Sequence, residues 1–198
     1  MPLRLLTIAL FLLVMSLLVL ERFSGPPTFP VTVVRVDQES NYHTGESLTR
    51  GEIVTTAEGY LEITIGEDTR IFLSKNTQIE LQRLFEDEVV IKLTKGRIVV
   101  DTQADTPVRI RTNRTQHLVH KSSASFVNYD FLQTVHVFPL TDTVQTTIGD
   151  ENLITPLPLA IYETEPLRYE AITMNLAASD AKDFYVWAGV LTDEVSLR

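Results

Sequence analysis

Apolar and polar residues alternate in short runs over much of the chain. Leu61, Ile63 and Ile65 form one such run, and Ile79 with Leu81 form another. Every second side chain of a β-strand points to the same face, so this spacing is typical of strands with one buried face. The same spacing recurs in segments 71–73, 89–93, 98–100, 108–110 and 135–137. We therefore predict a long series of half-buried strands.

Turn-forming residues separate these runs. The clusters are Gly66-Glu67-Asp68, Ser74-Lys75-Asn76, Glu86-Asp87-Glu88, Lys95-Gly96 and Asn128-Tyr129-Asp130. Short strands at regular spacing with turns between them indicate a sandwich, a barrel or a short solenoid. No repeat of fixed period singles out a regular solenoid. The predicted fold class is mainly β, a short antiparallel or solenoid-like β sandwich over residues 31–150.

The N-terminal segment has no such alternation. Residues 5–20 are apolar apart from Thr7 and Ser16. A run of this length without a polar face is typical of a membrane helix or of a signal-peptide core. No small-residue cleavage site follows, which favours an uncleaved anchor over a cleavable signal peptide. We predict a signal anchor or transmembrane helix over residues 1–23 and a proline-rich linker over residues 24–30. This predicts a single-pass protein of the cell membrane whose C-terminal domain is extracytoplasmic.

Residues 151–198 carry a third pattern. Pro156, Pro158 and Pro166 predict an extended connection, because proline disrupts both helices and sheet ladders. Further on, four apolar residues recur at helical spacing, namely Phe184, Trp187, Ala188 and Leu191. Ser179 or Asp180 can cap a helix that starts there. We expect a short amphipathic helix from about Asp180 to Leu191 whose apolar stripe docks on the β domain.

The composition narrows the range of partners. The formal net charge is −9, which argues against nucleic acid as a partner, since binding its backbone needs clustered Lys and Arg. The chain has no cysteine. Disulfides, thiolate zinc sites and a cysteine nucleophile are therefore excluded.

The carboxylates are the first candidates for acid–base chemistry. Glu67 and Asp68 are adjacent in a predicted turn, so their side chains diverge. Glu62 and Glu80 fall on the polar faces of predicted strands. A catalytic carboxyl needs a raised pKa and hence burial, and the pattern predicts none. We expect these groups to be solvated.

The histidines and serines do not form a recognisable catalytic or metal pattern. His117 and His120 are three residues apart in an extended segment, which sends them to opposite faces, and we expect surface histidines. The serine-rich segment 122–125 lacks the nucleophile elbow. Arg109, Arg111 and Arg114 form the one basic concentration, which fits either a solvated strand face or a site for an acidic ligand or lipid headgroup. We predict no catalytic, cofactor-binding or metal-binding residues, no cofactor, and no enzymatic activity.

The order of these segments resembles the FecR domain family. The matching positions are Gly51, Thr55, Ile71, Leu73, Asn76, Thr77, Ile79, Leu81, Leu93 and Gly96. The resemblance extends from about Gly45 to Thr147 and departs from the family pattern in segments 66–69, 123–127 and 135–139. It implies an extracytoplasmic, strand-rich domain behind a single transmembrane helix. The matching residues are scaffold positions and identify no active site.

The resemblance and the anchor suggest a function. Well-known family members relay a signal to a sigma factor through a cytoplasmic N-terminal domain, whereas only about four residues precede the apolar run here. We therefore expect a non-catalytic, membrane-anchored envelope protein that exposes a FecR-like β domain for protein or glycan binding, without the sigma-regulating domain. The alternative is an anchored jelly-roll protein that handles periplasmic lipid, as in lipopolysaccharide transport. The alternative requires Leu61, Ile63, Ile71 and Ile91 to line an apolar cavity.

Overall fold

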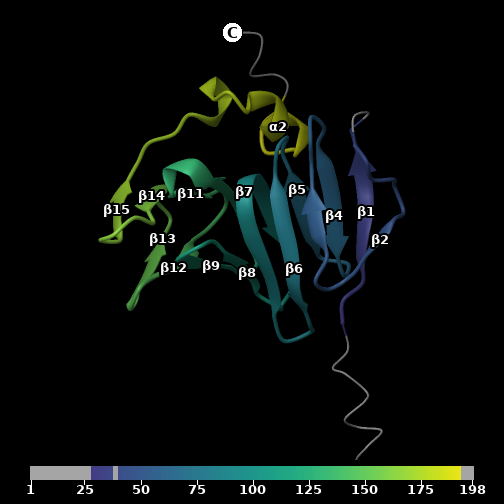
Figure 1. Ribbon diagram of the computed structural model, residues 1–198, viewed down its shortest axis with the longest axis horizontal. Coiled ribbons are helices and arrows are strands. Elements are labelled where there is room, and N and C mark those ends of the chain that lie inside the picture. The colour runs from purple at the N-terminus through teal and green to yellow at the C-terminus, as the bar shows by residue number, and fades with distance from the viewer. Residues whose placement is uncertain (1–27, 38–39, 193–198) are drawn as a thin grey trace, which may run out of the picture.

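The computed structural model describes residues 28–37 and 40–192 (Figure 1). The described chain is mainly antiparallel β-sheet with one short helix near its C-terminal end, as the alternation predicts. The predicted anchor (1–23) and most of the predicted linker (24–30) lie outside the described residues. Among the residues that are described, no helix is long and apolar enough to cross a membrane.

The described strands are, in chain order, β1 Val31–Val36, β2 Ser47–Leu48, β3 Ile53–Thr55, β4 Leu61–Ile65, β5 Thr69–Leu73, β6 Gln78–Leu84, β7 Val89–Thr102, β8 Val108–Arg111, β9 Thr115–Val119, β10 Ser123–Tyr129, β11 Thr134–Pro139, β12 Val144–Ile148, β13 Glu151–Thr155, β14 Leu159–Tyr162 and β15 Arg168–Ala171. The helical elements are the 3-10 turns η1 Asp130–Leu132 and η2 Leu176–Ala178 and the helix α2 Lys182–Trp187.

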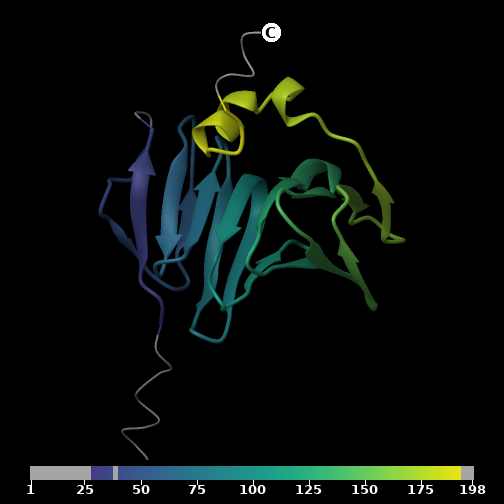
Figure 2. The same cartoon turned by 180° about the vertical axis from the view of Figure 1, so that it is seen from behind.

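Strand β7 belongs to two layers. Its first half pairs with β6 and β8 in a first layer, ordered β3-β6-β7-β8-β9-β12-β13. Its second half pairs with β5 and β10 in a second layer, ordered β2-β1-β4-β5-β7-β10-β11-β14-β15. Only the β7–β8 pairing is parallel among the described strands. The strands that follow β7 diverge into two groups in both views (Figures 1 and 2).

The crossing point is Gly96, where we predicted a turn at Lys95-Gly96. That prediction is wrong, because the strand continues through these residues and bends. Gly96 has φ +92°, in the left-handed region that favours glycine. A Cβ atom here would lie 2.5 Å from the Cα of Thr77, so no other residue fits without displacing backbone. Gly96 therefore lets one strand serve both layers.

Two side chains hold the bend. The Thr77 hydroxyl accepts a hydrogen bond from the Arg97 amide (3.0 Å) and donates one to the Arg97 carbonyl (3.1 Å). The Asn128 amide nitrogen donates to the carbonyls of Leu93 (2.8 Å) and Thr94 (2.9 Å). These bonds satisfy backbone groups that lose their ladder partners where the strand changes layers. The bend is thus stabilised by specific side-chain hydrogen bonds to the backbone.

The predicted alternation correctly identifies the core between the layers. Leu61, Ile63, Ile91 and Ile98 are completely buried, as are their equivalents on neighbouring strands. Their burial removes apolar surface from water and is the main favourable contribution to folding.

A second apolar cluster covers the outer face of the second layer. Phe72 of β5 and Val99 of β7 pack against Phe184 and Tyr185 of α2. The predicted docking of this helix is confirmed, but α2 is shorter than the predicted Asp180–Leu191. Neither predicted capping residue caps it: the Ser179 hydroxyl bonds to the Leu176 carbonyl, and Asp180 pairs with Arg97.

The segment after residue 150 is more regular than predicted. It contains β13, β14 and β15, whereas the prediction for residues 151–198 is an extended connection followed by a short helix. The β12–β13 hairpin spans the expected boundary, since Ile148 pairs with Glu151. Pro156, Pro158 and Pro166 lie in the connections between strands, so they remove no hydrogen bond from the β ladders.

We predict that Gly96→Ala destabilises the protein by about 3 kcal/mol or more, because the methyl group meets Thr77 and the backbone is strained. Gly51→Ala is the matched control, since Gly51 has a similar φ of +85° with nothing near its Cβ position. It should cost only about 1 kcal/mol. Urea unfolding measures both values. An equal loss of unfolding free energy in the two variants would show that the close packing of Gly96 on Thr77 does not contribute to stability.

Candidate functional site

A cleft of about 410 Å³ lies over the bend of β7. Its lining comes from five segments: Tyr60 before β4, the β5–β6 turn, the middle of β7, the end of β10 with η1, and the start of the α2 region. Asn76 and Gly96, two of the positions that carry the family resemblance, are part of this lining. The bend that joins the layers therefore also shapes the cleft.

The walls combine charged and aromatic groups. Three cations line the cleft, namely Lys75, Lys95 and Arg97. Two carboxylates face them, Asp130 and Asp180. The aromatic lining consists of Tyr60, Tyr129, Phe131 and Phe184. Such a mixture is suited to binding, since aromatic faces supply contact area and a few charged groups fix orientation.

Arg97 is the most enclosed of the three cations. Its guanidinium lies 5.7 Å from the centroid of the Tyr185 ring and 3.3 Å from the carboxylate of Asp180. Asp180 is 89% exposed at its side chain, so this ion pair is weak. The Nε of Arg97 is buried without a hydrogen-bond partner, and so is the Oδ1 of Asn128. A ligand carboxylate that replaces Asp180 can therefore gain a charge-assisted contact with Arg97.

The rim of the cleft presents apolar side chains to solvent. Phe131 is 79% exposed and Leu132 is 56% exposed, and both belong to η1. Gln133 ends this turn in a left-handed conformation with φ 49°. Adjacent exposed apolar side chains beside a charged cleft are typical of interaction surfaces.

The predicted carboxylates do not meet in this cleft. Glu67 and Asp68 lie exposed in the β4–β5 turn, as expected. Glu62 is buried, so its predicted solvation is wrong. It forms an ion pair of 3.0 Å with Arg35, whose guanidinium stacks on Trp187 at 3.9 Å from the ring centroid. The α2 region covers this strand face, which the local alternation could not indicate.

The two histidines of the H-x-x-H segment point in opposite directions, as predicted. His120 is exposed, and its Nε2 lies 3.1 Å from the carbonyl of Asp105. His117 is completely buried, so the prediction of a surface histidine is wrong for it. Its ring packs against Phe126 and lies between the hydroxyls of Thr115 (3.0 Å) and Thr146 (3.1 Å). No group of three metal-ligating side chains occurs among the described residues.

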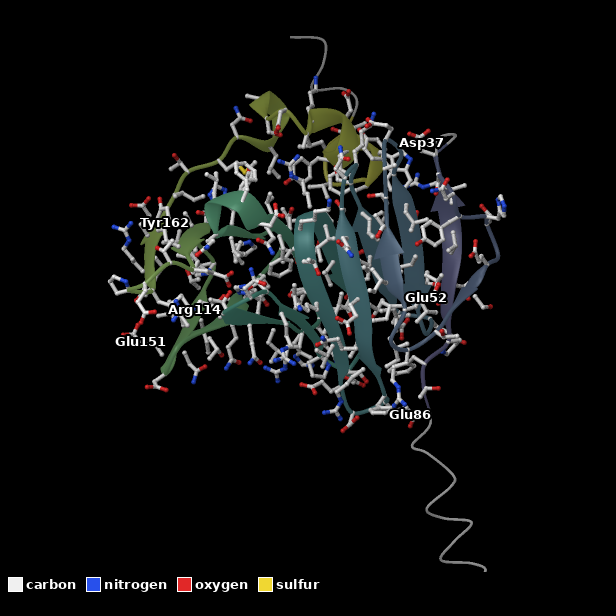
Figure 3. All side chains as sticks on the ribbon, viewed as in Figure 1. Asp37, Glu52, Glu86, Arg114, Glu151 and Tyr162 are labelled. Atoms are coloured by element: carbon white, nitrogen blue, oxygen red, sulfur yellow. The ribbon has the colours of Figure 1, made fainter. Side chains whose placement is uncertain are left out.

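Glu163 extends this buried network and was not anticipated from the sequence. Its Oε1 accepts hydrogen bonds from the hydroxyls of Thr112 and Thr115 and from the Arg114 amide (2.9 Å). Only 2% of Glu163 is exposed. The contacts join the loop after β14 to the β8–β9 turn across the two layers. Figure 3 shows Arg114, Tyr162 and Glu151 at this end of the molecule, away from Glu52 and Asp37.

The serines and the predicted arginine cluster are also dispersed. Ser125 is buried, and its hydroxyl lies 3.0 Å from that of Tyr185. Arg109 and Arg111 share the outer face of β8, whereas Arg114 contacts the Glu163 carbonyl at the far end. The three arginines therefore do not form one cluster: Arg109 and Arg111 lie together, and Arg114 lies apart.

Comparisons with known proteins match part of the chain to a family. The family model described as FecR protein matches residues 51–137, which confirms the predicted resemblance. Two crystal structures of an anti-sigma factor candidate from Parabacteroides distasonis, at 1.65 and 2.50 Å resolution, are similar in fold. Each has a TM-score of 0.55 and 14% sequence identity, and the match covers 69% of this chain and 64% of the other. No curated protein matches the chain. The match spans less than two thirds of the solved relative.

We predict that stability falls on acidification because of His117. Burial lowers the pKa of His117 from 6.5 to about 3, so the folded state keeps the ring neutral while the unfolded chain protonates it. The stabilisation is fully present above pH 6.5 and is lost as the pH falls toward 3. The free energy of unfolding should drop by about 2 kcal/mol between pH 7.5 and 5. Burial also lowers the pKa of half-buried His136, which acts in the same direction.

Urea unfolding at several pH values tests this prediction. His117→Gln should reduce the pH dependence, whereas His43→Gln, at an exposed position, should leave it unchanged. An unaltered slope in His117→Gln would contradict the assignment.

Proposed function

We propose that this chain, whose residues 51–137 are a FecR domain, is a non-catalytic, membrane-anchored envelope protein that binds another protein through the cleft over the β7 bend. The observation that carries the proposal is the exposed Phe131–Leu132 pair beside a cleft lined by both cations and aromatic rings. Sigma-factor binding is not transferred from the solved relatives, because a likeness at 14% identity concerns the fold alone.

The rim favours a protein partner over a glycan. Aromatic side chains at protein interfaces gain most of their binding energy when a partner desolvates them. Phe131 and Leu132 lie consecutively on η1 and offer such a contact. Lys75 and Lys95 then face acidic side chains of the partner, and Asp130 faces basic ones. A glycan would use the recessed rings, Tyr60 and Tyr129, and would leave the protruding apolar pair exposed.

The packed interior disfavours the lipid-handling alternative. Leu61, Ile63, Ile71 and Ile91 were the positions expected to line a lipid cavity. All four are completely buried within one continuous hydrophobic cluster. Side chains that close on one another leave no surface for an acyl chain to occupy.

Membrane anchoring rests on the apolar run at residues 5–20. We predict that the chain remains in the membrane fraction after alkaline washing, and that the β domain is digested when protease is added to spheroplasts. A water-soluble pool resistant to protease in intact spheroplasts would contradict both the anchor and the extracytoplasmic location.

Site-specific photo-crosslinking in intact cells tests the binding surface. A photoreactive amino acid at Phe131 should yield a discrete crosslinked band, because this residue is central to the proposed interface. The band should weaken at least about tenfold when Lys95→Glu reverses a charge in the cleft. The control position is Ile53, an exposed apolar residue of edge strand β3 that is not part of the cleft lining.

Protease digestion of the crosslinked band separates the two ligand classes, since only a protein partner yields foreign peptides. Equal bands at Phe131 and Ile53, or no band at Phe131, would contradict the proposed surface.

A further inference from the structure

The outer face of the first layer is basic, although the chain as a whole is strongly acidic. Four cations lie on strands β6 to β8, namely Arg83, Lys92, Arg109 and Arg111. The β-pairing places Arg111 beside Lys92, and Lys92 beside Glu80. The carboxylates on this face are Glu80 and Glu88, so its local charge is positive while the chain carries −9.

A depression of about 310 Å³ lies among these side chains. It is lined by Gln82, Arg83, Glu88, Val90, Arg109, Arg111 and Gln116. One carboxylate, Glu88, serves two guanidinium groups, at 2.7 Å from Arg109 and 3.3 Å from Arg83. Arg111 contacts only the neutral side chain of Gln82, at 3.4 Å, among the hydrogen bonds of the described residues. Its donors therefore remain available to an incoming anion.

The position of this face suggests where the anion comes from. The described chain begins at Thr28, which pairs with Phe85 in the β6–β7 turn, and the Phe29 amide donates to the Leu84 carbonyl (2.7 Å). Figure 3 shows Glu86 of this turn at the lower end of the molecule. The basic face starts directly beside this turn, at Arg83 and Glu88. It is therefore close to Thr28, the N-terminal end of the described chain, which the proline-rich segment connects in sequence to the predicted anchor.

We propose that this face binds the phosphate of an anionic lipid headgroup in the membrane that holds the anchor. The inference rests on the anchoring part of the proposed function. Guanidinium groups match phosphate oxygens through paired hydrogen bonds, and each basic residue near an anionic surface adds attraction. Glu86 and Asp87 in the neighbouring turn oppose this attraction, and Asp87 lies 3.6 Å from Arg83. The binding therefore centres on Arg109 and Arg111, on the strand face beyond the turn.

The absence of cysteine allows a direct test. The Leu118→Cys variant of the full chain carries one thiol, so an environment-sensitive fluorophore can be attached beside the depression, at the position that pairs with Arg109. The labelled chain is reconstituted into nanodiscs of phosphatidylcholine alone or with phosphatidylglycerol, and a headgroup-attached paramagnetic lipid serves as quencher. We expect quenching to be on the order of tenfold stronger with phosphatidylglycerol.

Arg111→Glu should abolish this difference, because it reverses a charge at the centre of the proposed site. The fold should be retained, since among the described residues the Arg111 side chain makes one long hydrogen bond. Arg168→Glu, at an exposed residue of β15 in the other layer, should preserve it. Thermal unfolding of each variant verifies that it is folded. Equal quenching in both lipid compositions, or an unchanged difference in Arg111→Glu, would overturn the proposal.

Inorganic phosphate distinguishes a lipid from a soluble ligand. Millimolar phosphate added to phosphatidylcholine discs should change the fluorescence only weakly. A saturable response to phosphate, without a response to phosphatidylglycerol, would assign the face to a soluble anion and overturn the lipid proposal. Failure of the chain to copurify with the discs would instead contradict the anchor, so the two failures are distinguishable.

Discussion

The bend of β7 at Gly96 joins the two layers of the domain. Gly96 packs so closely on Thr77 that a Cβ atom cannot fit, and the Thr77 hydroxyl and the Asn128 amide satisfy the backbone around the bend. One strand thereby contributes to both layers. The core forms between the layers, and the cleft forms over the bend. Asn76, Thr77 and Gly96, three of the positions that carry the resemblance to the FecR family, therefore have a geometric role.

The two layers have different outer surfaces. The α2 region covers the second layer with an aromatic cluster, and Arg35 bridges this cluster to the buried carboxylate of Glu62. The first layer keeps a polar outer face, on which Arg109 and Arg111 remain partly or fully exposed. This asymmetry leaves a charged and aromatic cleft beside α2 and a basic face on the opposite layer.

Local patterns predicted the strands and the inward side chains well, because the two-residue period directly reports which face of a strand is buried. Local patterns failed to predict burial where a side chain is covered by segments that are distant in sequence. Buried Glu62 pairs with Arg35, whose guanidinium stacks on Trp187 more than a hundred residues away in sequence. Buried His117 packs on Phe126 and belongs to a polar network that includes Glu163. We predicted a turn at Gly96 because glycine favours turns, but a glycine with positive φ is equally common where a strand bends. The cleft combines five separate segments, so no single stretch of sequence indicates it.

Native-state hydrogen exchange across β7 tests most directly whether the bend unites the two layers. If it does, amides of β8 and β9 in the first layer and of β10 and β11 in the second exchange through one global unfolding. We predict that their opening free energies agree within about 1 kcal/mol and fall together in urea. If the amides of one layer opened at a free energy more than about 2 kcal/mol below those of the other, the layers would be separate units and the bend would not be their common support.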